Sequence, residues 1–400
     1  MRRLLPLVCA VVVVDTMLYA ALVPLLPHFE KQYGLSKGGV GALAAAYAVG
    51  TLAGGIPGGL VSSRFGARTA VLGGLVLMSG ASVALALAGS FDTLFAARLA
   101  QGLGSALTWA GGLSWLATTT PRGRRGTVMG TAMGAAIFGA LLGPVIGAIG
   151  SVVGVRAAFA GIAVLGAVLA AWALRFEAPR REELSLAALP RAFRNAGFVQ
   201  GLWLILLPAL LFGTMSVLVP LALSSRGFGA VAIGACWLGS AAIESVINPL
   251  FGRMTDRSGF ALPVRLALIS SVVVSVALAA TEWPPVLVPL VLISGLAYGG
   301  YYAPGLTLMS HSAEEVGIAQ GLSFGVMNAA WAIGNAVGPA AGGALAQVTS
   351  DAVPYLAGAV ICGLSFAAMR RLGQERPAVV VDRLPGEVPG DVPALDARKR

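Results

Sequence analysis

Charged residues are scarce in this sequence of 400 residues. They make up 11% of the chain, whereas a soluble domain is typically about a quarter charged, and 57% of the residues are hydrophobic. Apolar stretches of about 20 residues, the length that crosses a hydrocarbon core of roughly 30 Å, recur along most of the chain. This composition excludes an ordinary soluble domain and predicts a polytopic membrane protein.

The sequence has few cysteines and lacks a nucleotide-binding loop. Cys9, Cys236 and Cys362 are far apart and lie in apolar stretches, so they suggest neither a disulfide framework nor a metal-binding spacing. The pattern G-x-x-x-x-G-K-[ST] is missing, which argues against an ATP-driven pump. Without a nucleophile constellation either, we expect no enzyme activity, no metal and no cofactor.

The long, unbroken apolar runs predict helices and not barrel strands, which would alternate in polarity over about ten residues. The first run starts like a signal peptide, but it has no convincing cleavage site before Pro27, and we expect it to be retained. Twelve spans are predicted, at residues 4–27, 39–61, 69–88, 93–118, 127–150, 156–174, 198–223, 229–251, 262–281, 285–309, 316–346 and 352–371.

The net charge of +10 does not point to nucleic acid, because its distribution follows the spans. One set of short loops holds only Lys31, Lys37, Arg156 and Arg226. The opposite set holds Arg2, Arg3, Arg64, Arg68, Arg122, Arg124, Arg125, Arg175, Arg180, Arg181, Arg191, Arg194, Arg253 and Arg257. By the positive-inside rule both termini are expected to be cytoplasmic. The acidic loop "SHSAEEVG", after the tenth span, is an exception on that side.

The two halves of the chain repeat each other. "YAALVPLLP" echoes "MSVLVPLAL", "GLVSSRFG" echoes "GRMTDRSG", and "GALLGPVIG" echoes "GNAVGPAAGG", each at an offset of about 195 residues. The first echo aligns Pro24 with Pro220. A constant offset indicates duplication of a six-helix unit, and parallel repeats of this kind place substrate sites near the membrane midplane between the halves.

This repeat divides the chain into four parts. We expect a six-helix bundle over 1–174, a cytoplasmic linker over 175–197 with a short amphipathic stretch, a second six-helix bundle over 198–371, and a disordered cytoplasmic tail over 372–400 rich in proline and charge.

Four motifs resemble the major facilitator superfamily over residues 4–371. They are the basic turns after spans 2 and 8, "RLAQGLGSA" in span 4, "GALLGPVIG" in span 5, and the aspartate of span 1 followed by "VPLLP". Within the superfamily the sequence is similar to the twelve-span drug:proton antiporters, which include bacterial multidrug exporters and, more distantly, the vesicular amine transporters. The resemblance implies an all-helical carrier in the inner membrane, working as a monomer.

Asp15 lies about 16 Å along a helix that starts near Leu4, close to the membrane midplane. A carboxylate there is costly unless it faces the bundle interior or a watery cavity. In the antiporters that this chain resembles, an acid in this region helps to bind cationic substrate or proton. The alternative is an aspartate bonded to a neighbouring helix for packing alone.

Glu244 lies about 12 Å inside the eighth span, measured from Gly252, and is the only acid placed deep in the second half. Asp15 and Glu244 therefore form the most economical pair for a proton-coupled cycle, with one acid in each half. A glutamate that merely bonds to Asn248, one turn later, is the alternative.

Two further motifs are assigned by the resemblance. Arg98 begins "RLAQGLGSA" and matches the family arginine that supports proton transfer, although it could be a structural anchor. "GALLGPVIG" implies a seal or pivot between the domains; glycines at this spacing also suit plain helix packing, and span 11 carries a close copy. The residues concerned are Gly139, Gly143, Pro144 and Gly147, with Gly338 and Pro339 in the copy.

The turns after spans 2 and 8 differ at one position. The second keeps Asp256, whereas the first has Ser63 where the family usually has aspartate. In the family this acid helps to latch the cytoplasmic side, so its loss is expected to weaken or reroute that latch. The other residues assigned to the two turns are Gly59, Arg64, Gly66, Gly252, Arg257 and Gly259.

Aromatic and amide side chains at membrane depth are candidates for contact with an organic cation or a flat apolar drug. We expect substrate contacts from Asp15, Tyr19, Asn328, Trp331 and Tyr301. The sequence thus predicts a proton-coupled exporter of small amphipathic, cationic organic compounds. The alternatives are a facilitator or proton symporter for a small polar metabolite and, in another class, a membrane sensor or scaffold that transports nothing.

Overall fold

The computed structural model describes residues 4–22, 25–34, 37–177 and 188–369, and the described residues are helical apart from short turns. The first group of helices comprises α1 (Leu4–Ala21), α2 (Leu26–Tyr33), α3 (Lys37–Phe65), α4 (Ala67–Ala86), α5 (Phe91–Thr119), η2 (Arg122–Arg124), α6 (Arg125–Val153) and α7 (Val155–Ala173). The second comprises α8 (Leu189–Ala192), α9 (Ala196–Ser224), α10 (Ala230–Ser258), α11 (Ala261–Ala280), α12 (Pro284–Gly299), α13 (Tyr302–Val316), α14 (Gln320–Val348) and α15 (Ala352–Ala368).

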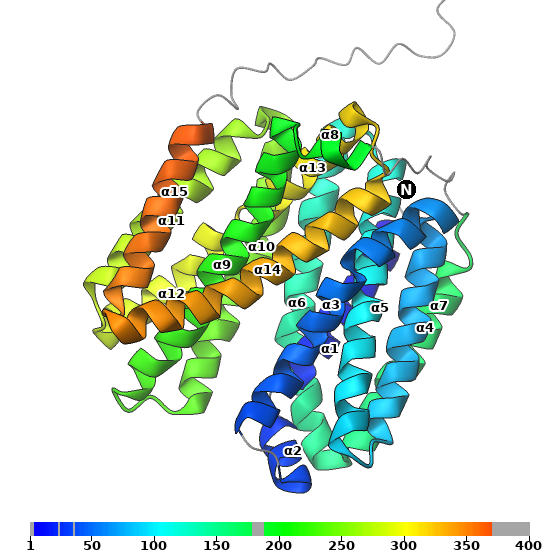
Figure 1. Cartoon of the computed structure of the whole chain (residues 1–400), viewed down its shortest axis with the longest axis horizontal. Coiled ribbons are helices and arrows are strands. Elements are labelled where there is room, and N and C mark those ends of the chain that lie inside the picture. The colour runs from blue at the N-terminus through cyan, green and yellow to red at the C-terminus, as the bar shows by residue number, and fades with distance from the viewer. Residues whose placement is uncertain (1–3, 23–24, 35–36, 178–187, 370–400) are drawn as a thin grey trace, which may run out of the picture.

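These helices form two bundles that lie side by side, with α1 to α7 in one and α9 to α15 in the other (Figure 1). With α12 and α13 taken as one interrupted segment and the short α2 and α8 set aside, the described part of each bundle contains six long helices. The bundles meet through α3 against α14 and α6 against α10. The structure therefore confirms the predicted fold class, an all-helical membrane protein of two six-helix repeats.

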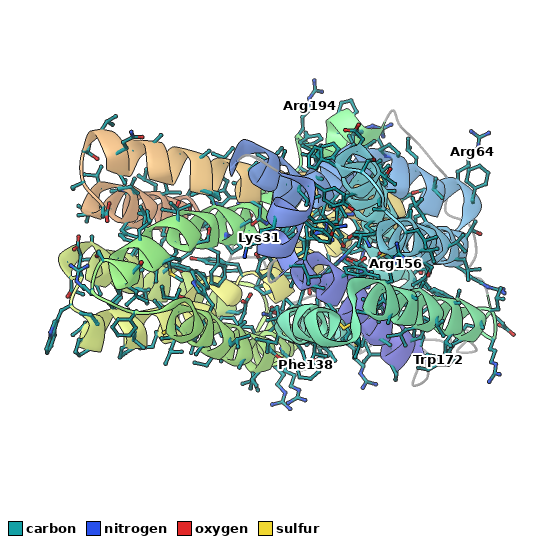
Figure 2. The ribbon with its side chains drawn as sticks, turned by 90° about the horizontal axis from the view of Figure 1, so that it is seen from below. Lys31, Arg64, Phe138, Arg156, Trp172 and Arg194 are labelled. Carbon is teal, nitrogen blue, oxygen red and sulfur yellow. The ribbon has the colours of Figure 1, made fainter. Side chains whose placement is uncertain are left out.

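Seven described segments are apolar and long enough to cross a membrane by length and composition alone, namely Leu4–Ala21, Ala67–Ala86, Arg122–Gly143, Arg156–Ala173, Ala196–Ser224, Ala261–Ala280 and Pro284–Val316. The long helices that fall outside this set include α3, α5, α10 and α14, whose glycine and polar residues pack between the bundles or face a central cavity. The outer surface is apolar, as at Phe138, which projects from α6 and is 50% exposed (Figure 2).

The repeat is visible in the backbone of the two matched turns. Gly66 joins α3 to α4 with φ 97°, and Gly259 joins α10 to α11 with φ 76°. Residues that carry a side chain rarely have a positive φ. Glycine adopts it readily, which allows two long helices to follow each other almost without a loop. We call the end of the molecule that carries these turns, together with the arginines of η2, the basic end. Arg64 projects outward there (Figure 2).

Two predicted spans, the first and the tenth, are interrupted where unbroken helices were expected. The first span was expected to run unbroken over 4–27, but α1 ends at Ala21 and a separate helix, α2, begins at Leu26. Pro24 and Pro27 lack the backbone N–H that would continue the helix. Pro24 and the tail over 372–400 lie outside the described residues, as does much of the linker.

The tenth span, expected over 285–309, is instead interrupted and longer. It breaks between α12 and α13, where Gly299 and Gly300 favour helix less than other residues and Pro304 cannot donate to the carbonyl of Gly300. The acidic segment "SHSAEEVG", expected to be a loop, forms the last turns of α13 up to Gly317, where φ is 72°. The eleventh span consequently starts at Gln320, after its expected start at 316.

Candidate functional site

A cavity of about 240 Å³ lies between the two bundles, in the middle of the long helices. It receives side chains from α1, α3, α5 and α6 on one side and from α9, α10, α13 and α14 on the other. Asp15 and Glu244 both line it, one from each bundle. Its aromatic walls comprise Tyr19, Tyr47, Trp109, Phe212, Tyr302 and Trp331.

Asp15 is almost fully buried, with 1% of its surface exposed, and is surrounded by hydrogen-bond donors. Its Oδ1 accepts from Tyr47 Oη at 2.7 Å, from Ser105 Oγ at 2.8 Å and from Trp109 Nε1 at 3.3 Å. The distance from Thr108 Oγ1 to Asp15 Oδ2 is 2.5 Å. A carboxylate offers about two lone-pair sites on each oxygen, so the protein itself fills those of Oδ1 and one of those of Oδ2.

Two of these partners, Ser105 and Thr108, could have been found from the sequence as part of a polar stripe. Arg98, Gln101, Ser105 and Thr108 are spaced by three or four residues, which places them on one face of α5. Such a polar stripe in a membrane span faces the protein interior. Tyr47 comes from α3, and its approach to Asp15 depends on how α3 packs against α1 and α5.

Arg98 does not contact Asp15 but holds the end of α1. Its guanidinium donates to the carbonyl oxygens of Leu18 at 3.1 Å and Tyr19 at 3.2 Å, which are among the last in that helix. The cation also lies 4.9 Å from the centre of the Tyr47 ring. An arginine at a helix C-terminus satisfies free carbonyls and opposes the negative end of the helix dipole. Arg98 thus positions α1 and Tyr47, the two elements that carry and contact the acid.

Glu244 has a different environment. It is 8% exposed, and no hydrogen bond reaches its carboxylate from the described residues. Asn248 Nδ2 donates to the backbone carbonyl of Glu244, at 3.2 Å, and not to its side chain. The carboxylate lies against Gly299, the last residue of α12, where a Cβ atom would come within 2.9 Å of the Glu244 Cδ atom. The alternative role as a partner of the Asn248 side chain is therefore not what the geometry shows.

Four of the five predicted substrate contacts line the cavity, Asp15 among them, and one does not. Tyr19 packs edge-on against Trp331 of the other bundle, with ring centres 6.2 Å apart, and Asn328 donates to the carbonyl of Ala106 at 3.2 Å. Tyr301 instead points into the second bundle, where its hydroxyl donates to Ser271 Oγ at 2.8 Å. The neighbouring Tyr302 lines the cavity, because successive residues of a helix point about 100° apart.

The basic end is closed by contacts between the bundles. Asp256, at the end of α10, accepts from Gly126 N at 2.7 Å and from Thr127 N and Oγ1, both at 2.6 Å, at the start of α6. A carboxylate at this place satisfies free amides and favours the positive end of the helix dipole. Arg257, beside Asp256, is exposed.

The matched turn in the first half lacks this arrangement. Ser63 is buried and its hydroxyl donates to the carbonyl of Gly59 in its own helix, at 2.9 Å. A second type of bridge joins the bundles nearby: Arg125 and Arg122 pair with Glu314 at 2.5 Å and 2.8 Å. Glu314 belongs to the segment "SHSAEEVG", the acidic exception on the arginine-rich side of the membrane.

The motif glycines divide into two groups by what they contact. Gly59 packs against the carbonyl of Gly321, and Gly252 packs against that of Gly126, so both allow the bundles to approach each other. Gly139 of "GALLGPVIG" packs against Val13 and Thr16 of α1, within one bundle.

The described glycines of this motif do not lie between the bundles in this conformation, and their expected role as a seal or pivot stays a prediction. Gly143 packs against Ala20 of α1, and in the span 11 copy Gly338 and Pro339 pack against α9, again within one bundle. The surroundings of Pro144 and Gly147 lie outside the part of the chain whose side chains are described.

Comparison with solved structures shows the same fold. The human organic anion transporter MFSD10 (TETRAN) superposes with a TM-score of 0.77 at 18% identity, over 92% of this chain and 99% of that one. The proton:xylose symporter XylE superposes with a TM-score of 0.75 at 15% identity, over 93% and 95%. At these identities the likeness concerns the fold alone.

Curated relatives match over shorter stretches. A probable vesicular acetylcholine transporter-B from Danio rerio is 33% identical over 124 residues, which is 29% of this chain and 25% of that protein. A methylenomycin A resistance protein from Streptomyces coelicolor is 45% identical over 74 residues, 18% of this chain and 15% of that protein.

The family model described as Major Facilitator Superfamily matches residues 8–324. Since that match covers most of the chain, the protein belongs to the Major Facilitator Superfamily.

Proposed function

We propose that the protein is a proton-coupled antiporter that exports small, amphipathic, cationic organic compounds. The observation that carries the proposal is the pair of buried carboxyl groups, Asp15 and Glu244, which line one aromatic cavity from opposite bundles. Ionisable groups at membrane depth mark ion and substrate pathways, and aromatic faces attract organic cations. In a carrier built from two repeats, such a site can be exposed to either side as the bundles rock.

The hydrogen bonds around Asp15 support a role in carrying a proton. Thr108 Oγ1 lies 2.5 Å from Asp15 Oδ2 and 2.8 Å from the carbonyl oxygen of Ser105. A hydroxyl has one proton, so Thr108 cannot donate to both oxygens. When Asp15 is protonated on Oδ2 it donates to Thr108, which donates to Ser105; when Asp15 is charged, Thr108 turns its proton toward it. One hydroxyl rotation thus accommodates both states.

The relatives give weaker support for the type of substrate. The two matched proteins are named for acetylcholine, an organic cation, and for resistance to methylenomycin A, which suits an exporter of small organic compounds. The matches cover a quarter or less of those proteins, so the proposal depends mainly on the cavity.

The orientation follows from the arginines. We place the basic end and both termini in the cytoplasm and the chain in the inner membrane, by the positive-inside rule. Because Asp256 and Glu314 join the bundles at the basic end, the conformation described here is then closed toward the cytoplasm. The bundles converge at that end and diverge toward α2 (Figure 1).

Flux into proteoliposomes tests the proposal. The purified full chain is reconstituted, a pH gradient is imposed, and movement of the cationic dye ethidium is compared with that of small polar metabolites. We expect dye flux that requires the gradient and is lost in Asp15→Asn but kept in Asp92→Asn, a matched change at an exposed position. Dye movement that ignores the gradient, or metabolite flux down its own gradient, would contradict antiport.

A further inference from the structure

The two acids of the cavity differ in what the protein supplies to them. Asp15 receives hydrogen bonds from the side chains of α3 and α5, which occupy its lone pairs. Glu244 is only 8% exposed, yet its carboxylate accepts no hydrogen bond from any described residue. A carboxylate that is shielded from bulk water and faces a cavity without a protein donor favours a proton or a cation from outside the protein.

No basic side chain in the described part of the chain neutralises Glu244. The ion pairs found there are those of Glu314 with Arg122 and Arg125, at the basic end, and that of Glu282 with Arg226, at the other end. The titratable side chains that share the cavity with Glu244 are Asp15, Tyr19, Tyr47 and Tyr302, which carry no positive charge.

The local fold keeps the Glu244 carboxylate at the cavity wall. It lies against Gly299, where a larger residue would displace it, and the interruption between α12 and α13 follows at once. The aromatic rings of Phe212, Tyr302 and Trp331 line the same cavity. An unpartnered carboxylate among aromatic faces is suited to an ammonium or phosphonium centre, including one that cannot donate hydrogen bonds.

From this contrast we infer that Glu244, and not Asp15, contacts the cationic centre of the substrate and determines the preference for cations over neutral compounds. The inference rests on the proposed function. It assigns the proton to Asp15 and the substrate cation to Glu244. Asp15 would have to give up protein hydrogen bonds to meet a cation, whereas Glu244 has none to lose. The substrate class is a permanent or protonated organic monocation that carries an aromatic group.

Binding to the purified full chain tests the assignment. The probes are tetraphenylphosphonium, a permanent cation, and triphenylphosphine oxide, a neutral amphipathic compound of similar shape, measured by calorimetry at fixed pH. We expect the parent to prefer the cation, and Glu244→Gln to weaken cation binding by about tenfold while neutral binding changes by less than about twofold. Glu315→Gln, an exposed glutamate of α13, is the matched control.

Asp15→Asn is expected to retain the preference for the cation and to lose gradient-driven flux. If Glu244→Gln does not fold, Glu244→Asp provides the test, because the shorter side chain keeps the charge and should lose only part of the preference. A preference that survives in Glu244→Gln, or that is lost in Asp15→Asn instead, overturns the inference. A parent that prefers the cation through Glu244 but moves none in a pH gradient upholds the inference and contradicts the proposed antiport.

Discussion

The carboxylate of Asp256, in the second bundle, accepts hydrogen bonds from the backbone N–H groups of Gly126 and Thr127, at the first turn of α6 in the other bundle. A helix cap is normally supplied from the residue just before the helix. Here it comes from the opposite half of the molecule, so the cap exists only while the bundles are closed at the basic end. It therefore stabilises one conformation of the carrier.

Replacing Asp256 with asparagine is expected to shift the equilibrium away from closure at the basic end. Asp256 accepts with both carboxylate oxygens, whereas asparagine has one acceptor oxygen and would place an NH2 group against a donor. Loss of one such hydrogen bond costs about 1 kcal/mol, roughly a fivefold change in population. Thiol labelling of a cysteine introduced at Thr131, on α6 near the interface, reports the change as faster labelling from that side. Ser258→Ala, an exposed position near the end of α10, should leave the rate unaltered.

Ser63→Asp is expected to have the opposite effect. It restores at the end of α3 the acid that the matched position of α10 carries, and Ser63 already lies against Gly321 at the start of α14. A carboxylate there should favour closure of the basic end by about 1 kcal/mol, and the thiol at position 131 should label more slowly. Equal labelling in Ser63→Asp, Ser63→Ala and the parent would contradict the expected role of this position as a latch.

Much of the fold was predictable from the sequence, because the length of the apolar runs depends on the membrane and the internal repeat indicates two similar bundles. The interruption of the tenth span was less apparent, since Gly299, Gly300 and Pro304 stand within an otherwise apolar run. The two acids of the cavity were also apparent, as rare charges in long spans.

What could not be predicted is how each acid is surrounded. Tyr47 reaches Asp15 from α3, whereas no described residue donates to the Glu244 carboxylate; both follow from how separate helices pack. Tyr301 and Tyr302 are adjacent and chemically identical, so only their orientation decides which one faces the cavity. The contact between Asp256 and α6 likewise joins residues that are far apart in the sequence.

Gly252→Ala is expected to impair transport by keeping the bundles apart. A methyl group at this position would overlap the carbonyl of Gly126, which is backbone and cannot move independently. Overpacking of a tight contact typically costs about 1–3 kcal/mol. Here it destabilises only the conformation that is closed at the basic end, in which the two glycines meet. Gly73→Ala, within α4 and with no atom within 4 Å of the added methyl, is the matched control and should transport like the parent. Similar dye flux in both variants would contradict the close contact.

Thr108→Val is expected to change the pH dependence of transport, because it removes the hydroxyl that bonds to Asp15 in both of its protonation states. Valine matches the shape of threonine but cannot relay a hydrogen bond between Asp15 Oδ2 and the carbonyl of Ser105, and a buried group left unpaired costs about 1–3 kcal/mol. The pH at half-maximal dye flux should therefore move relative to the parent. Thr118→Val, on the same helix but bonded only to carbonyls of α5, should leave the pH profile in place.

The central claim is that a cation and protons exchange at the two acids of one cavity. Its most direct measurement is proton release on cation binding, with purified protein in lightly buffered solution, a pH-sensitive dye and tetraphenylphosphonium as the probe. We predict that protons are released in proportion to the cation bound, and that the release is lost when Asp15→Asn and Glu244→Gln are combined. Cation binding by the parent with no release of protons across the pH range of transport would contradict the account.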